Sequence, residues 1–113
     1  MITIHALLVR RADLSRAQFR AYYDNQHRAL FERVTPPGVR AGIVRYVQHH
    51  AVERSAAEQD SPWDCITEMG FADAAALRSW GVWYAGDGGA VLRDDELNFM
   101  DNSRRRIVLT EPR

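Results

Sequence analysis

The order of four apolar, strand-like segments and two helical patterns is the feature that most constrains the fold of this chain. Strands are expected at 2–9, 42–52, 63–71 and 105–110, where β-branched and aromatic residues gather. Helical patterns follow the first and third of these segments. The resulting order, β-α-β-β-α-β, is that of a ferredoxin-like α+β domain, a four-stranded antiparallel sheet with both helices on one face.

The first helix is expected over 16–33 because its start carries a capping box. Ser15 can accept a hydrogen bond from the backbone of Gln18, whose side chain can return one. Leu14 and Phe19 occupy the two positions of a hydrophobic staple around the same start. The helix must end before the proline pair that follows, since proline removes a donor and restricts the residue before it.

The second helix is expected to be short. Asp73 can cap it, its apolar pattern covers 74–80, and the glycine-rich stretch 81–91 then interrupts it. One or two further helical turns are expected through 92–97 before the last strand. Residues 53–62 are polar and are expected to form an exposed loop between the second and third strands.

Length and composition favour one domain, 1–113, with a single core. Fifteen Lys and Arg balance fifteen Asp and Glu, unlike the basic surfaces that bind nucleic acids or anionic membranes. The basic run 104–106 is expected to be a solvated strand start. The single cysteine, Cys65, permits no intramolecular disulfide and is expected to be buried and unreactive. The apolar start is too short for a membrane span and lacks the pattern of a signal peptide, so we expect a cytoplasmic protein.

A sheet with helices on one face leaves its other face bare. Neither alternate set of strand residues is uniformly polar, and a large exposed apolar face marks a partner or a ligand site. We therefore expect a homodimer whose two sheets meet face to face and enclose a cavity in each half, a dimeric α+β barrel.

His27 is the first candidate for a working group. At about 100° per residue, Phe19 and Tyr23 share the buried side of the first helix. Tyr22 lies on one flank of that side and His27 on the other. A histidine ordinarily titrates near neutrality, which suits general acid or base catalysis. Two interpretations stay open: a histidine at the edge of the core bonded to backbone, and an imidazole aimed into a cavity.

Polar side chains in the middle strands are the next candidates. Tyr46, Gln48 and His50 share one face of the second strand, where they suit a cavity wall or a solvent-exposed face. Glu68 lies in the middle of the third strand and is expected to face the cavity or solvent, because an unpaired carboxylate in the core is costly. His49 and His50 point in opposite directions, and no phosphate-binding loop is present, so neither a metal nor a nucleotide cofactor is expected.

Four segments, taken in order, resemble motifs of EthD-domain proteins: "FRAYYDNQHRAL", "RYVQHH", "DCITEMGF" and "DDELNFMDNSR". The resemblance covers essentially the whole chain and implies a dimeric α+β barrel with His27 in a pocket. Other residues on motif positions are Tyr22, Tyr46, Gln48, His50, Asp64, Glu68, Asn98, Phe99 and Asp101. The chain departs from the motifs at Tyr23, Ala29, His49, Cys65 and Gly70. Two of these replace tryptophan, which is expected to enlarge or reshape the pocket.

The resemblance implies a family that includes cofactor-free cyclases, dehydratases and lactone isomerases. The leading hypothesis is a cofactor-independent lyase or isomerase acting on a small, apolar, oxygenated compound, such as an aromatic polyketide intermediate or a lactone. His27 would move a proton next to a carbonyl, and Tyr46 or His50 would donate a hydrogen bond to the enolate oxygen. Either histidine could be the main base. The residues expected to bind or orient the substrate are Tyr22, Tyr23, Gln48, Glu68, Phe99 and Asp101.

Two alternatives remain on the same fold. One is a cofactor-free monooxygenase of the quinol type, which would consume oxygen. The other is a non-enzymatic accessory or ligand-binding protein, for which replacing His27 would leave ligand binding unchanged and no turnover would be seen.

Overall fold

The predicted four-stranded sheet is present in the computed structural model, which describes residues 1–57 and 61–113. Its strand order is β2-β3-β1-β4, and each neighbouring pair is antiparallel. The strands are β1 (Ile2–Leu8), β2 (Ile43–His50), β3 (Cys65–Phe71) and β4 (Arg106–Thr110). Part of the expected loop at 53–62 lies outside the described residues, at 58–60.

The first helix has the predicted extent but is not uniform along its length. It consists of α1 (Arg16–Ala21), the π-helical segment η1 (Tyr22–His27) and α2 (Arg28–Val34). The capping box is present, with Ser15 N–H donating to Gln18 Oε1 at 2.8 Å and Gln18 N–H donating to Ser15 Oγ at 3.1 Å. The sequence pattern did not indicate a π-helical turn, a rare feature found frequently at functional sites.

The second helix is longer than predicted. Asp73 caps it as expected, accepting a hydrogen bond from the backbone of Ala76 at 2.8 Å. However, α4 (Ala74–Ala85) continues through Gly81 instead of ending at 80. Trp80, Trp83 and Tyr84 pack against the core on either side of that glycine, and such packing outweighs its weak helix propensity.

The remaining helices are short. The predicted turn or two after the glycine-rich stretch is α5 (Ala90–Glu96), preceded by η3 (Asp87–Gly89). A helix that was not predicted, α3 (Pro37–Ala41), begins directly after the end of the first helix. Its proline stands at the first helical position, where the missing amide costs nothing. The 3₁₀ segment η4 (Asn102–Arg104) leads into β4.

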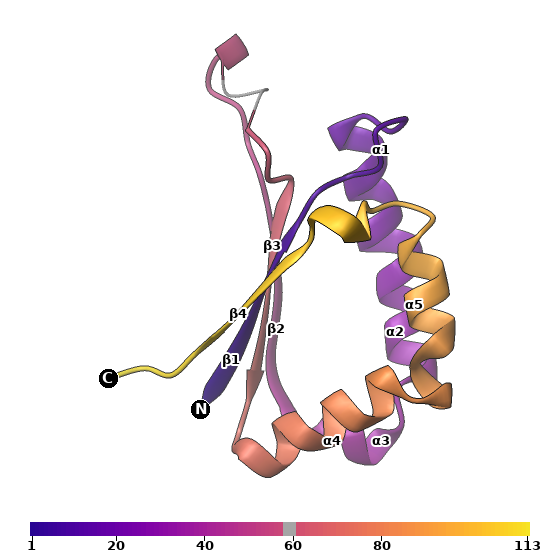
Figure 1. The fold of residues 1–113 in the computed structure, drawn as a ribbon, viewed down its shortest axis with the longest axis vertical. Helices are drawn as coiled ribbons and strands as arrows, with labels where there is room; N and C mark the ends of the chain where they lie inside the picture. The colour runs from indigo at the N-terminus through magenta and orange to yellow at the C-terminus, as the bar shows by residue number, and fades with distance from the viewer. Residues whose placement is uncertain (58–60) are drawn as a thin grey trace.

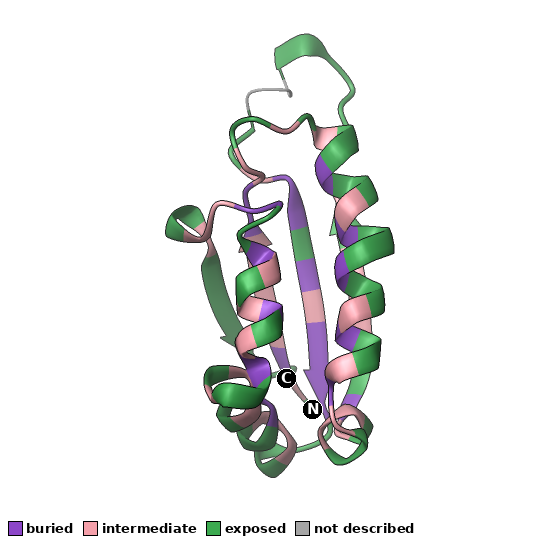
Figure 2. Cartoon of the chain, turned by 90° about the vertical axis from the view of Figure 1, so that its right-hand side faces the viewer, coloured by how far each residue is buried: buried purple, intermediate pink, exposed green. Residues whose placement is uncertain are grey.

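All the helices lie to one side of the sheet or at its lower end. Figure 1 shows α1, α2 and α5 facing the sheet, with α3 and α4 below them. In Figure 2 the helices turn their buried sides toward the sheet and their exposed sides outward. Among the described residues, none of the helices has the length and apolar character needed to cross a membrane.

The core consists of two clusters between the sheet and the helices. One cluster contains Leu8, Phe19, Tyr23, Cys65, Phe99 and Met100. The other contains Phe31, Ile43, Met69, Phe71, Trp80 and Leu92. Members of both clusters line the same cavity. This cavity therefore interrupts the core that covers the sheet.

The reactivity of the Cys65 thiol reports how well the first cluster is packed. Its side chain is 1% exposed, and burial raises the pKa of the thiol to about 12. We expect the folded protein to be inert to a thiol-specific reagent such as DTNB at about pH 8, because the thiolate is the reactive form. Unfolding in guanidinium chloride should release one reactive thiol per chain. Rapid labelling of the folded protein would contradict this packing.

Candidate functional site

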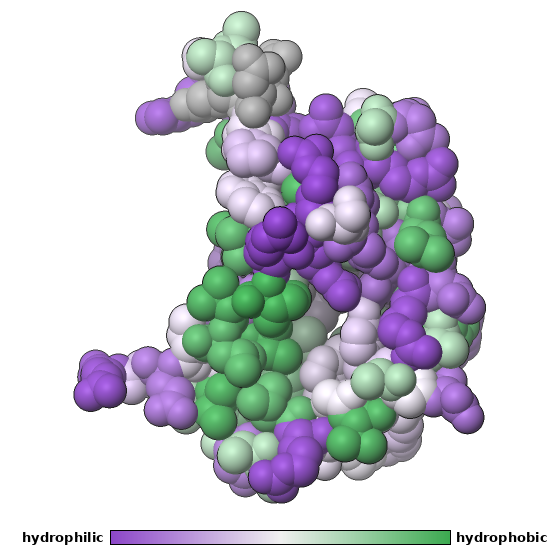
Figure 3. Space-filling view, viewed as in Figure 1, coloured by the Kyte–Doolittle hydropathy of each residue, from purple (hydrophilic) through white to green (hydrophobic). Residues whose placement is uncertain are grey.

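A largely apolar cavity of about 420 Å³ lies between the sheet and the helices. In Figure 3 an apolar surface on the sheet side borders a hollow that separates it from the helices. Ile107 and Leu109 of β4 line this cavity and are 52% and 57% exposed, so they form part of its rim. The apolar side chains farther inside include Ile4, Ala6, Leu8, Phe31, Met69, Trp80, Leu92 and Met100.

His27 contributes an imidazole to the cavity wall and is 6% exposed. Its Nδ1 atom lies 2.8 Å from Oδ2 of Asp95. An ionised carboxylate only accepts hydrogen bonds, so neutral His27 carries its proton on Nδ1 and keeps the lone pair on Nε2. Within the described residues Nε2 has no hydrogen-bond partner. The interpretation of His27 as a histidine bonded to backbone is therefore not supported.

Asp95, at the end of α5, is held by donors from two elements. Tyr22 donates its hydroxyl to Oδ1 at 2.5 Å, and Asn98 donates Nδ2–H to the same oxygen at 3.0 Å. Burial by itself raises the pKa of the Asp95 carboxyl, but the hydrogen bonds from Tyr22, His27 and Asn98 outweigh it and lower the pKa. Asp95 is therefore ionised near neutral pH, which fixes the tautomer and orientation of the imidazole.

Tyr22 and Phe99 support this pair and do not line the cavity. Their rings stack at 5.1 Å between centroids, and the Phe99 ring lies 4.9 Å from that of His27. Phe99 is 0% exposed. Both had been expected to bind substrate, and the structure places them behind the imidazole.

Two predicted tyrosines do line the cavity, Tyr23 and Tyr46. The hydroxyl of Tyr23 lies 2.7 Å from Thr67 Oγ1, and that of Tyr46 lies 3.5 Å from the Tyr23 hydroxyl. Gln48 does not line the cavity but donates to the Tyr46 hydroxyl at 2.9 Å. Burial raises the pKa of both tyrosines, so both hydroxyls stay protonated near neutral pH and are able to donate.

Three other predicted site residues lie outside the cavity. His50 shares the helix-facing side of β2 with Tyr46, as expected, but its Nε2 contacts Oδ1 of Asp24 at 2.8 Å near the end of the strand. Asp101 accepts hydrogen bonds from the backbone and hydroxyl of Ser103 and caps η4. Neither position brings the side chain to the cavity wall.

Glu68, the third of these, lies on the face of the sheet away from the cavity. Its carboxylate accepts a hydrogen bond from Arg45 Nε at 2.5 Å and lies 3.0 Å from His49 Nε2. Hydrogen bonds, first from Arg45 and then from His49, lower the pKa of Glu68. Of the two orientations that the sequence left open, the one toward solvent is observed.

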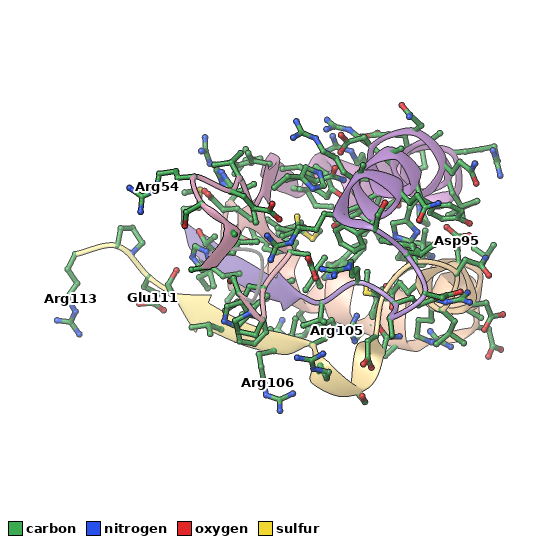
Figure 4. The ribbon with its side chains drawn as sticks, turned by 90° about the horizontal axis from the view of Figure 1, so that it is seen from above. Arg54, Asp95, Arg105, Arg106, Glu111 and Arg113 are labelled. Carbon is green, nitrogen blue, oxygen red and sulfur yellow. The ribbon has the colours of Figure 1, made fainter. Side chains whose placement is uncertain are left out.

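Four polar residues of the site were not recognised from the sequence. Asp95 and Glu96 follow Asp94 in the segment "DDELNFMDNSR" that resembles an EthD motif, but the resemblance alone assigned them no role. Tyr84 was assigned to a glycine-rich break and Arg105 to a solvated basic run. Arg105 instead turns inward to line the cavity, whereas its neighbour Arg106 projects away from the protein (Figure 4). The alternation of an extended segment explains this difference.

Nothing in the described residues groups three or more His, Cys, Asp or Glu side chains as a metal ion would require. The acidic and basic groups of the site are instead paired with one another. The arrangement therefore offers a base, protonated hydroxyls and a guanidinium around an apolar space.

Comparison with known proteins gives the same fold. A Bacillus halodurans protein of the ethyl tert-butyl ether D (EthD) family matches with a TM-score of 0.67 and 20% identity over 100% of this chain and 99% of that chain. A Bacteroides fragilis protein described as dimeric, with a ferredoxin-like fold, has a TM-score of 0.63 and 10% identity over 98% and 95%. A candidate antibiotic biosynthesis monooxygenase from Nitrosomonas europaea has a TM-score of 0.60 and 12% identity over 99% and 98%.

A search of curated protein sequences found no significant match. The sequence profile of the EthD domain, in contrast, matches residues 11–103. This match includes the whole first helix, strands β2 and β3, and the α5 segment that carries Asp95. The chain therefore belongs to the EthD-domain family.

Proposed function

We propose that the protein is a cofactor-independent lyase or isomerase that moves a proton next to a carbonyl group in a small, apolar, oxygenated compound. The observation that carries this proposal is the His27–Asp95 pair, 2.8 Å apart, in the wall of an apolar cavity. A neutral imidazole whose tautomer is set by a carboxylate is a general base with its lone pair directed away from that carboxylate. Aromatic polyketide intermediates and lactones are suitable substrate classes.

The proposed reaction begins when Nε2 of His27 accepts a proton from the carbon next to the carbonyl. The C–H bond breaks, its electron pair forms the enolate, and negative charge develops on the oxygen. Asp95 stabilises the imidazolium that results, while the Tyr46 hydroxyl donates a hydrogen bond to the oxygen. The imidazolium then returns the proton at another position or transfers it to a leaving group, which gives isomerisation or elimination.

The surroundings of the pair favour this chemistry. Phe99 packs on the imidazole, and aliphatic and aromatic side chains form most of the cavity wall. Electrostatic interactions and hydrogen bonds to a developing charge are stronger in such an environment than in water. The cavity volume of about 420 Å³ lies within the range of about 300–1,000 Å³ found for small-molecule sites.

We also propose that the functional unit is a homodimer formed through the helix-free face of the sheet. Ile66 and Val108 lie on this face and are 40% and 48% exposed. The similar Bacteroides fragilis protein is described as dimeric. A second copy would cover these apolar side chains and leave the cavity, on the other face of each sheet, open to substrate.

The quinol-type oxygenase is the second candidate, favoured by the likeness in fold to the Nitrosomonas europaea protein. It would use His27 in the same way, to deprotonate a phenol, but the resulting carbanion would react with oxygen. Oxygen uptake with a hydroquinone, lost on replacing His27, would establish this alternative over the isomerase.

His27→Ala tests the proposed base. With 2-tetralone in D2O, we expect the wild-type protein to accelerate deuterium incorporation next to the carbonyl, measured by proton NMR. The variant should lose about 100-fold or more of that rate, because it lacks the group that accepts the proton. Binding of the ketone should change little.

Arg33→Ala is the control for this experiment, because Arg33 is exposed on α2, in the same long helix as His27, and does not line the cavity. It should retain the wild-type rate. An unchanged rate in His27→Ala would remove His27 from the mechanism. Absence of exchange with the wild-type protein, across a panel of ketones and lactones that bind, would favour the accessory function.

Asp95→Asn tests the lowered pKa of the carboxyl. The ionised form stabilises the folded protein above the ordinary carboxyl pKa of about 3.9, and this stabilisation is lost as the pH falls through the lower pKa of the folded state. We expect the variant to be less stable than wild type at about pH 6, with a difference that shrinks below about pH 4. Urea unfolding, followed by tryptophan fluorescence, measures the free energy of unfolding of the variant and of the wild-type protein at each pH.

Asp94→Asn is the control for the pH series, since Asp94 is the exposed neighbour on the same helix. Its stability should follow that of the wild-type protein over the whole range. A constant difference between Asp95→Asn and wild type at every pH would show that the carboxyl contributes no ionisation-dependent stability.

A further inference from the structure

A second group of polar residues, Tyr84, Glu96 and Arg105, lies in the cavity wall and takes no part in the proposed proton transfer. Glu96 is 5% exposed and accepts hydrogen bonds from the Tyr84 hydroxyl at 2.7 and 2.5 Å. Arg105 donates from Nη1 to Oε1 of Glu96 at 3.1 Å and to the Tyr84 hydroxyl at 3.2 Å. All three residues line the cavity.

The contacts of Arg105 with Glu96 and Tyr84 use only part of its N–H donors. Both of its contacts use the same nitrogen, Nη1, whereas a guanidinium carries five N–H donors on three nitrogens. Within the described part of the chain, Nε and Nη2 have no hydrogen-bond partner. The side chain is 27% exposed and lines the cavity, so these donors are accessible to a molecule bound there.

The charge of the group favours an uncharged partner. Burial lowers the pKa of Arg105, but hydrogen bonds and attraction from Tyr84 and Glu96 outweigh it and raise the pKa, so the guanidinium stays charged. Glu96 balances this charge. A carboxylate on a ligand would approach Glu96 unfavourably, whereas a carbonyl or phenolic oxygen could accept from Arg105 without that repulsion.

The positions of Tyr46 and Arg105 favour an elongated ligand. Tyr46 belongs to β2, and Arg105 directly precedes β4, so the two residues approach from opposite edges of the sheet. Three strand spacings, about 14 Å, separate the backbones at these edges, and the two long side chains reach inward from them. A ligand that contacts both side chains must therefore extend through the cavity, whose wall also includes His27.

We infer that Arg105 is a substrate-binding residue whose free donors hold a second, uncharged oxygen of the substrate, at the end far from Tyr46. This inference rests on the proposed function and narrows its substrate class to elongated, fused-ring or similar compounds with oxygen at both ends. One oxygen belongs to the carbonyl group next to which His27 removes the proton. The other is a carbonyl or a phenolic hydroxyl, and a hydroxyl could also donate to Glu96.

Two ketones that differ by one distant hydroxyl test the inference. 6-Hydroxy-2-tetralone carries its hydroxyl at the opposite end from the carbonyl, and 2-tetralone lacks it. Hydrogen bonds to a charged group contribute enough for an expected gain in affinity of roughly 10- to 100-fold from that hydroxyl. We expect calorimetric titration of the wild-type protein to show this gain and Arg105→Gln to abolish it.

Two further variants separate recognition from folding. Arg105→Gln leaves Glu96 with one partner fewer, so a double variant that also carries Glu96→Gln removes both charges together and should fold. It should bind the two ketones equally. Arg106→Gln, next in the chain but projecting outward (Figure 4), should keep the full preference for the hydroxylated compound. Equal binding of both ketones by the wild-type protein, including no binding of either, or a preference retained without Arg105, overturns the inference.

Deuterium exchange on the same two ketones distinguishes this inference from the proposed function. Exchange next to the carbonyl reports the proton transfer by His27, whereas the difference in affinity reports the contact with Arg105. Binding preference without exchange would reject the proposed reaction and leave Arg105 as a ligand-binding residue. Exchange that depends on His27, together with equal affinity for the two ketones, would support the proposed reaction and reject Arg105 as the residue that binds the second oxygen.

Discussion

The hydrogen bond between Asp95 and His27 is the interaction on which the rest of the site depends. It joins α5 to the middle of the first helix, and Tyr22 and Asn98 reinforce it from either side. Tyr23 and His27 both belong to the π-helical segment η1, both are buried, and their ring centroids lie 5.7 Å apart. The contact of Asp95 with His27 holds α5 against the first helix, and the next residue of α5, Glu96, lines the cavity.

The cavity combines an apolar interior with polar groups that are almost all satisfied by one another. A buried carboxylate is costly unless it is paired, and Glu96 meets that requirement with Tyr84 and Arg105, while Asp95 does so with Tyr22, His27 and Asn98. Burial and the nearby Glu96 charge raise the pKa of Tyr84 to about 12, so this hydroxyl remains a donor. The protein therefore keeps charges at the wall of an apolar space without leaving either carboxylate unpaired.

Local sequence signals predicted those parts of the structure that depend on neighbouring residues. The capping box at Ser15, the cap at Asp73 and the alternation in β2 that groups Tyr46, Gln48 and His50 all act within a few residues, and each is observed. Continuation of α4 through Gly81 and the choice of Asp95 over Asp94 depend instead on packing between distant segments. Position along a strand matters as well as its face: His50 and Tyr46 share a side of β2, yet only Tyr46 reaches the cavity.

Consecutive positions on α5 contact different side chains: Asp95 contacts the imidazole of His27, and Glu96 contacts the guanidinium of Arg105 at the β4 edge of the sheet. Because the two contacts involve different residues, one set can change during evolution while the other is kept. Substitutions at Tyr84, Glu96 and Arg105 could change which compound is retained while Tyr22, Asp95 and Asn98 continue to hold the imidazole. Descendants of one ancestral domain could in this way acquire different ligands and keep the same His–Asp pair.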